Sequence, residues 1–128
     1  MITVIVADDH TVLRDGLRYL LEAQGDIQIV GMAANGQEAV EQARLYCPDV
    51  VVMDISMPVM NGIEATKLIC QSCSNTKIVI LSMHHTAEYM QRALEAGALG
   101  YLLKDSAGTE LVTAIRALNQ GESYFSQK

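Results

Sequence analysis

One stretch, residues 48–62 (PDVVVMDISMPVMNG), constrains the fold of this chain more than any other. Residues 50–53 within it form an unbroken apolar run with no polar alternation. Such a run is typical of a strand covered by helices on both faces, as in the interior of a parallel sheet. Asp54 follows at the carboxyl end of this predicted strand, where open parallel sheets gather ligands and chemistry. We therefore place Asp54 at the centre of the function.

The rest of the chain alternates predicted strands and helices, with no internal linker and no low-complexity segment. The apolar runs predict strands at residues 2–7, 27–31, 50–53, 78–81 and 101–103. Amphipathic segments between and after them predict five helices, for which Thr11, Asn35 and Thr86 are expected N-caps. This alternation predicts an α/β domain with a doubly wound, five-stranded parallel sheet of order 2-1-3-4-5.

The carboxyl ends of four predicted strands carry polar residues. The first strand is followed by Asp8 and Asp9, the third by Asp54, the fourth by Ser82 and the fifth by Lys104. With this strand order the first and third strands are neighbours at the topological switch point, so their acidic groups converge in one crevice. The inference depends on the agreement of the strand ends and not on any single motif.

The chemistry of this set favours phosphoryl transfer. Three close carboxylates repel one another, and a hard divalent cation such as Mg²⁺ or Mn²⁺ removes that conflict. An aspartate carboxylate can itself attack phosphorus, and the transfer then needs charge neutralisation more than acid-base catalysis. The cation, the Lys104 ammonium and the Ser82 hydroxyl would supply it, with Asp54 as the acceptor.

Each of these residues also has a purely structural alternative. Asp8 or Asp9 could cap the first helix, and Asp54 could be a turn residue. Ser82 commonly ends a strand, and Lys104 alone would be a solvated surface charge. Two successive acids exceed what a cap needs, and Asp9 is the better candidate for a direct metal ligand. Taken together, the strand ends favour the functional interpretation.

Histidines and cysteines give weaker signals. His84 and His85 are adjacent, so their side chains diverge and cannot share a metal; we interpret both as loop residues, of which at most His84 lines the site. Cys70 and Cys73 form a C-x-x-C, which is a candidate redox or metal motif. No second pair exists and no strand precedes the motif, so both are better interpreted as small apolar residues on a helix face.

Composition excludes several classes of function. The net charge of −6 and the absence of a basic stripe argue against direct nucleic-acid binding by these residues. No apolar run approaches the roughly 20 residues needed to span a bilayer, and the start of the chain is a strand and not a signal peptide. We expect one domain, a cytoplasmic location and no membrane partner.

The residues above resemble the receiver domain of two-component response regulators. The matching segments are residues 6–10 (VADDH), 53–62 (MDISMPVMNG), 81–84 (LSMH) and 96–104 (AGALGYLLK). The likeness covers nearly the whole chain. The sequences of the last two segments are most similar to those of the NarL/FixJ-like subfamily, whose receivers precede a LuxR-type helix-turn-helix DNA-binding domain. The resemblance implies a flavodoxin-like receiver fold.

The resemblance also implies a role for each residue of the site. Asp54 accepts a phosphoryl group from the phosphohistidine of a sensor histidine kinase. The metal ligands are Asp8, Asp9, Asp54 and the backbone carbonyl of Ser56. Lys104 contacts the phosphoryl group. In this family the domain is a phosphoacceptor switch and not an enzyme, with only self-phosphorylation and slow autodephosphorylation.

A second implied group is a switch formed by Ser82 and Tyr101, in which the hydroxyl bonds the phosphoryl group and the ring moves inward. Two departures from the family pattern stand beside it. Asp105 follows Lys104 where many receivers have proline, so a cis-proline is not carried over. Met83 is larger than the small residue common there, and we expect it to alter the rate of phosphate loss.

The resemblance further implies a domain division and partners. Residues 1–121 form the receiver, and residues 122–128 start a linker to an effector domain absent from this chain. A sensor histidine kinase is the expected partner, a homodimer on activation is compatible with the subfamily, and DNA is contacted only through the missing domain.

Two other function classes were weighed against the switch. A phosphohydrolase with an aspartate nucleophile would carry a second acid two residues on, where this chain has Ser56. A flavin-binding module would carry a phosphate-binding loop after the first strand, which this chain lacks. A degenerate receiver that is not phosphorylated is disfavoured by the intact acidic set.

Overall fold

A computed structural model describes residues 1–83 and 86–125 of the chain, so the predictions for His84 and His85 fall outside the described residues. In chain order the elements are β1 (Ile2–Ala7), α1 (Thr11–Glu22), β2 (Ile27–Ala33), α2 (Gly36–Tyr46), β3 (Val50–Asp54), α3 (Gly62–Ser72), β4 (Lys77–Ser82), α4 (Ala87–Ala96), β5 (Gly100–Leu103), a 3₁₀ turn (Lys104–Ser106), α5 (Ala107–Asn119) and β6 (Tyr124–Phe125).

The strands form one parallel sheet in the order β2-β1-β3-β4-β5-β6. The predicted α/β class and the order 2-1-3-4-5 are confirmed. The sixth strand is a difference from the prediction, which had five. It is only two residues long, too short to show a periodic pattern, and it pairs with β5 within the segment expected to begin the linker.

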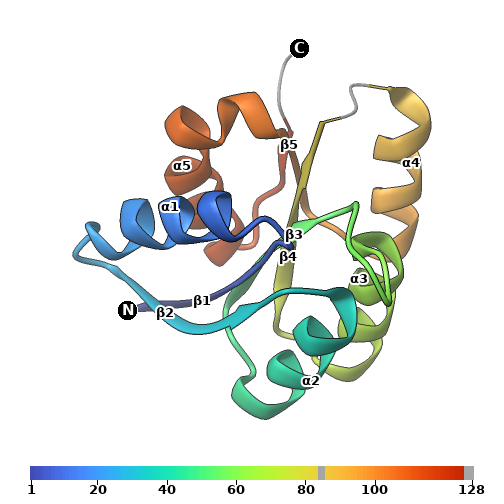
Figure 1. Cartoon of the computed structure of the whole chain (residues 1–128), viewed down its shortest axis with the longest axis horizontal. Coiled ribbons are helices and arrows are strands. Elements are labelled where there is room, and N and C mark those ends of the chain that lie inside the picture. Colours follow the sequence, from blue (N-terminus) through green and yellow to red (C-terminus); the bar gives the residue numbers. More distant parts are fainter. Residues whose placement is uncertain (84–85, 126–128) are drawn as a thin grey trace.

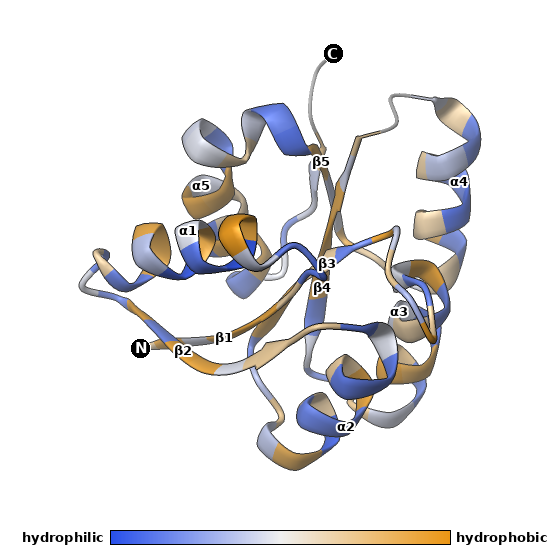
Figure 2. Cartoon of the chain, viewed as in Figure 1, coloured by the Kyte–Doolittle hydropathy of each residue, from blue (hydrophilic) through white to orange (hydrophobic). Residues whose placement is uncertain are grey.

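Helices cover both faces of the sheet, which places the core in two layers (Figure 1). Residues alternate between the faces along each strand. Val51 and Met53 of β3 pack with α2, α3 and α4, whereas Val50 and Val52 pack with α1 and α5. The apolar stripes of the helices turn toward the sheet in Figure 2. The central strand β3 is therefore buried over its whole length.

Local signals set the helix starts. The Asn35 side chain accepts the Glu38 amide at 2.9 Å, and the Glu38 carboxylate accepts the Ala34 amide at 2.8 Å, as in a capping box. Thr86 caps α4 as predicted. Thr11 is not the N-cap of α1, since the cap position falls on His10. The Asp8 carboxylate already accepts the His10 amide, so a free donor at this helix start is satisfied without Thr11.

None of the helices in the described part of the chain has the length and apolar character required to cross a membrane.

Candidate functional site

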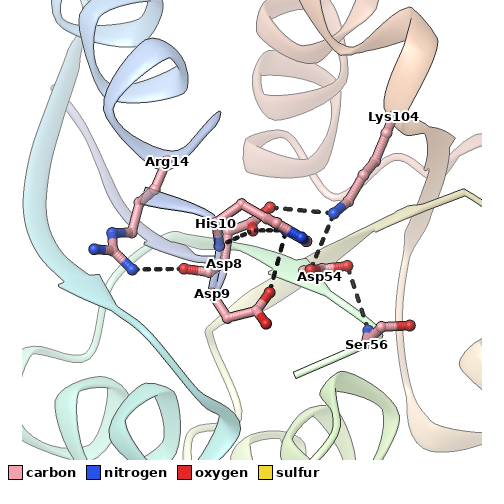
Figure 3. A network of polar contacts seen from close by, with 7 residues as sticks. All are labelled: Asp8, Asp9, His10, Arg14, Asp54, Ser56 and Lys104. Carbon is pink, nitrogen blue, oxygen red and sulfur yellow. Dashed lines mark hydrogen bonds and ion pairs between the residues drawn. The ribbon is translucent and has the colours of Figure 1, made fainter. Parts of the chain in front are cut away.

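Parallel strands bring the predicted site residues to one edge of the sheet. The carboxyl ends of β1, β3, β4 and β5 lie side by side because these strands are consecutive neighbours in the sheet. Figure 3 shows Asp8, Asp9, Asp54 and Lys104 pointing into the same space. Ligand atoms of Asp8, Asp9, His10 and Asp54 all lie within 4.8 Å of one another. The convergence of acidic groups predicted from the strand ends is present.

Asp54 is fixed by contacts to both of its carboxylate oxygens. Its side chain is 2 % exposed. The Ser56 amide donates to Oδ1 at 3.3 Å, and Lys104 Nζ lies 3.0 Å from Oδ2 (Figure 3). Burial raises the pKa of Asp54, and the neighbouring charge of Asp8 adds to that shift, while Lys104 opposes it. Lys104 is thus the cation that favours the ionised carboxylate.

Asp8 is the second buried acid, with a side chain that is 1 % exposed. Lys104 Nζ lies 3.5 Å from its Oδ2, so one ammonium group faces both buried carboxylates. The His10 amide donates to Asp8 Oδ1 at 2.8 Å, and Arg14 Nη1 donates to the Asp8 backbone carbonyl at 2.7 Å. These contacts fix the turn from β1 into α1 and aim the carboxylate across the crevice at Asp54.

His10 belongs to this site, although the sequence analysis gave it no role. Its Nδ1 lies 3.1 Å from Asp8 Oδ1 and 3.2 Å from Asp9 Oδ1, between the two acids. Asp9 is more open, with its side chain 31 % exposed. The position of His10 directly after two predicted metal ligands was the available signal. Arg14 was also missed, because its contact is to backbone and leaves no pattern in the sequence.

The loop after β3 is held by two close glycine contacts. The Gly62 amide donates to the Ile55 carbonyl at 2.8 Å, and a Cβ on Gly62 would collide with the Asp54 carbonyl oxygen. The Gly36 amide donates to the Met60 carbonyl at 3.0 Å, and a Cβ there would meet that same oxygen. The starts of α3 and α2 therefore pack directly against the end of β3 and the loop that follows Asp54.

Ser82 lines the same hollow as Asp54 and Lys104, and Ser82 and Tyr101 are both 1 % exposed. Burial raises the pKa of the Tyr101 hydroxyl, and the Ser82 side chain opposes that shift. Met83, in contrast, is 78 % exposed and lines a hollow of about 150 Å³ together with Asp54, Ser82 and other site residues.

The oxygen atoms of this crevice fit a hard divalent cation. Asp8 Oδ2 and Asp54 Oδ2 are buried and receive no hydrogen bond from the described residues, although both face the Lys104 ammonium. Carboxylate oxygens are the ligand type that Mg²⁺ and Mn²⁺ accept. The donor set of Asp8, Asp9 and Asp54 is consistent with the predicted ion.

The C-x-x-C cysteines do not converge on a common site. Cys70 Sγ donates to the Gly97 carbonyl at 3.7 Å, beside α4, whereas Cys73 Sγ donates to the Ala43 carbonyl at 3.6 Å, in α2. Both thiols are buried enough that burial raises their pKa. The two thiols of the C-x-x-C therefore face different neighbouring helices and do not act as a pair.

Comparison with known proteins agrees with this geometry. The family model described as the response regulator receiver domain matches residues 4–116. The transcriptional regulatory protein LiaR of Bacillus subtilis (strain 168) is 45% identical over 128 residues, which are 100% of this chain and 61% of LiaR. The uncharacterized transcriptional regulatory protein YxjL of the same organism is 46% identical over 124 residues, or 97% of this chain and 57% of YxjL.

A solved structure gives the same answer for the fold. A two-component response regulator of the LuxR family from Aurantimonas sp. SI85-9A1 superposes with a TM-score of 0.94 at 38% identity, covering 99% of this chain and 91% of that one. The chain spans only 57% and 61% of the length of the two curated relatives it matches. By sequence and by fold, the chain belongs to the receiver domains of two-component response regulators; its relatives include two transcriptional regulatory proteins and a response regulator of the LuxR family.

Proposed function

We propose that this domain is a phosphorylation-controlled signalling switch whose acceptor is Asp54. The observation that carries the proposal is the setting of that carboxylate. The carboxylate is buried and accepts a hydrogen bond from the Ser56 amide at 3.3 Å. Its other oxygen forms an ion pair with Lys104 Nζ at 3.0 Å. A nucleophile that must attack phosphorus in line needs this combination of fixed direction and nearby positive charge.

The residues that would hold the divalent cation are Asp8, Asp9 and Asp54, with the backbone carbonyl of Ser56 as a further ligand. Mg²⁺ or Mn²⁺ bound there neutralises charge on the transferring phosphoryl group. Its positive charge also favours the ionised form of Asp54, against the effect of burial.

The transfer step follows from the proposed acceptor. An Asp54 carboxylate oxygen attacks the phosphorus of a phosphohistidine on a sensor histidine kinase. The P–N bond breaks, the electron pair leaves with the imidazole, and an aspartyl phosphate forms. Lys104 lies where it can pair with a phosphoryl oxygen, since it already contacts the acceptor carboxylate. Attack of water on the phosphorus later releases phosphate and restores Asp54.

The switch element in this proposal is the Ser82–Tyr101 pair. The new negative charge on Asp54 draws the Ser82 hydroxyl, which would form a hydrogen bond to the phosphoryl group. The ring of Tyr101 is held inward in this structure, against the core. The proposal therefore couples the chemistry of Asp54 to the packing of β5.

The output of the switch is proposed from the relatives. About two fifths of their length lies outside the part that this chain covers, and both are named transcriptional regulatory proteins. We propose that residues 122–128 lead toward a DNA-binding domain, and that activation controls this domain through dimerisation of the receiver. Direct contact with DNA would belong to that domain and not to this one.

The test is intact mass after incubation with acetyl phosphate, a small phosphoryl donor, in the presence of Mg²⁺. The wild-type chain should gain one phosphoryl group, and Asp54→Ala should gain none. Asp105→Asn is the matched control, because it removes the same charge beside Lys104 but leaves the acceptor in place. A sample with the metal chelated should remain unmodified.

Two outcomes would contradict the proposal. Equal phosphorylation of Asp54→Ala would show that another residue is the acceptor. No gain in the wild type, with metal binding shown by calorimetry and a purified kinase also tested, would remove the phosphoacceptor role. Steady turnover of an aromatic phosphomonoester would instead favour a phosphohydrolase over a switch.

A further inference from the structure

Two cysteines outside the proposed phosphoryl site lie together at one end of the α2–α3 helix pair. These helices are side by side on the same face of the sheet (Figure 1). Cys47 directly follows α2 and Cys73 directly follows α3, so each is the C-cap residue of its helix. Crossover helices that cover one face of a parallel sheet run in the same direction, so the carboxyl ends of the adjacent helices α2 and α3 lie near each other.

Both thiols donate hydrogen bonds to successive backbone carbonyl groups in the last turn of α2. Cys73 Sγ donates to Ala43 O at 3.6 Å, and Cys47 Sγ donates to Arg44 O at 3.8 Å. The Ala43 carbonyl also accepts the Cys47 amide at 2.8 Å. Burial raises the pKa of Cys73, and the adjacent Cys47 thiol adds to that shift. Both thiols therefore lie at the same last turn of α2, although the residues are far apart in sequence.

The pair combines an accessible and a protected thiol. Cys47 is exposed, whereas Cys73 is 8 % exposed. The backbone of Cys47 has a φ of 45°, in the left-handed region that helix ends usually fill with glycine or asparagine. Backbone preference therefore does not account for a cysteine at this position. Cys70, the partner expected from the C-x-x-C spacing, instead contacts Gly97 on the other side of α3.

We propose that Cys47 and Cys73 form a reversible intramolecular disulfide when the protein meets a hydroperoxide. The Cys47 thiolate attacks the peroxide, the O–O bond breaks, and an alcohol or water leaves as the sulfur becomes a sulfenic acid. The Cys73 sulfur then attacks the Cys47 sulfur, the S–O bond breaks, and water leaves with the proton of the Cys73 thiol. Two thiols are oxidised and one hydroperoxide is reduced.

The cross-link would join the ends of two helices whose starts press on the Asp54 loop through Gly36 and Gly62. Its formation should raise the midpoint of thermal unfolding, because it restricts the unfolded chain between residues 47 and 73. A dithiol reductant should return both the thiols and the original midpoint.

The test is thiol counting after treatment of the whole 128-residue chain with hydrogen peroxide. The chain has three cysteines, so the untreated protein should take up three maleimide labels after denaturation. The oxidised wild type should take up one, and peptide mass spectrometry should place that label on Cys70 and find a peptide that joins Cys47 to Cys73. Reduction should restore all three labels.

Variants separate this pair from the alternatives. Cys70→Ser is the matched control and should form the cross-link at the wild-type rate. Cys47→Ser and Cys73→Ser should form none, and Cys73→Ala repeats the second change without placing a hydroxyl in the core. Circular dichroism before oxidation identifies any variant that is unfolded.

Three results would overturn the inference. They are a cross-link that includes Cys70, a disulfide only between two chains, or oxidation of Cys47 to sulfinic acid while Cys73 still takes its label. None of them bears on phosphorylation of Asp54, so this inference and the proposed function can fail separately.

Discussion

Burial of Asp54 opposes the ionised state that attack on phosphorus requires. The raised pKa of this carboxyl has burial as its first cause and the charge of Asp8 as a further one. The folded domain therefore holds a charge that the unfolded chain would carry more easily. At the scale of single residues, the site is built at the expense of stability.

Asp54→Asn should stabilise the fold in the absence of divalent metal. The substitution removes the buried charge at nearly constant volume, and we expect a gain of about 1–2 kcal/mol in the free energy of unfolding at neutral pH. Urea denaturation with a metal chelator present is the measurement. Asp105→Asn, which removes a charge outside the buried pair, should change the free energy of unfolding by much less.

The advantage of Asp54→Asn should depend on pH in a defined direction. A carboxyl whose pKa is raised on folding takes up its proton more readily in the folded state, so the wild type loses stability as pH rises through that raised value. The gap between variant and wild type should therefore open as pH rises from the ordinary carboxyl pKa to the raised one, stay constant above it, and close toward acidic pH. A gap that widens on acidification would contradict the assignment.

Lys104→Met should destabilise the domain by about 3 kcal/mol, since it leaves Asp8 and Asp54 buried without a cation. Lys67→Met is the control, because Lys67 is exposed on α3. Denaturation curves should also show that Mg²⁺ recovers part of the loss in Lys104→Met, as one cation replaces another. A loss equal to that of Lys67→Met would show that Lys104 has no such role.

Five residues of the candidate site could be predicted because chemistry and position coincide in the sequence. Each stands at the end of a recognisable apolar run: Asp8, Asp9, Asp54, Ser82 and Lys104. Contacts made by backbone groups leave no such signal. The Arg14 bond to a carbonyl and the Ser56 amide bond to Asp54 depend on loop geometry that only the folded chain shows.

At the scale of elements, the starts of α2 and α3 position the site, and the glycines at these starts allow the close backbone packing there. Gly62→Ala should cost about 2 kcal/mol or more, because its Cβ would collide with the carbonyl oxygen of Asp54. Gly16→Ala in α1 should instead stabilise by about 0.5–1 kcal/mol, since no atom lies within 4 Å of the new Cβ. Thermal unfolding of the two variants should therefore shift in opposite directions.

A shift of the same sign and size in both glycine variants would contradict this account of the α3 start. Functionally, Gly62→Ala should also slow phosphorylation of Asp54, because the collision displaces the carbonyl of the acceptor residue itself. Gly16→Ala should leave that rate unchanged.

Element prediction succeeded where a local pattern was long enough. Buried strands such as β3 and capped helices such as α2 carry their signals within a few residues. It failed at β6, where two residues pair with β5 through a contact set by the tertiary fold. It also misplaced the cap of α1, because the competing acceptor was Asp8 and lay outside the helix motif.

At the scale of the whole molecule, the acidic crevice joins strands that hold both layers of the core. A divalent cation that binds only the folded domain should therefore stabilise it globally, by about 2.7 kcal/mol at about 100 times its dissociation constant. Thermal unfolding with increasing Mg²⁺ should show a rising midpoint in the wild type. The rise should be much smaller in Asp54→Asn, and an equal rise would place the cation elsewhere.

The architecture was predictable because five βα units in series leave few topologies open. The structure confirms the doubly wound order that this alternation favours. The pairing of Cys47 with Cys73 was not predictable, because it depends on the packing of α2 against α3 and has no fixed spacing along the chain.

The glycines at the starts of α2 and α3 also affect how mutational data on this domain should be interpreted. In a saturation scan scored by signalling output, Gly36 and Gly62 should tolerate replacement as poorly as the acids do. Neither offers a side chain to a ligand, and both are needed because another backbone lies in the space of their Cβ. Loss of output at these positions would result from the close backbone packing around Asp54 and not from a lost catalytic group. A search for catalytic residues based on such a scan should therefore exclude both glycines.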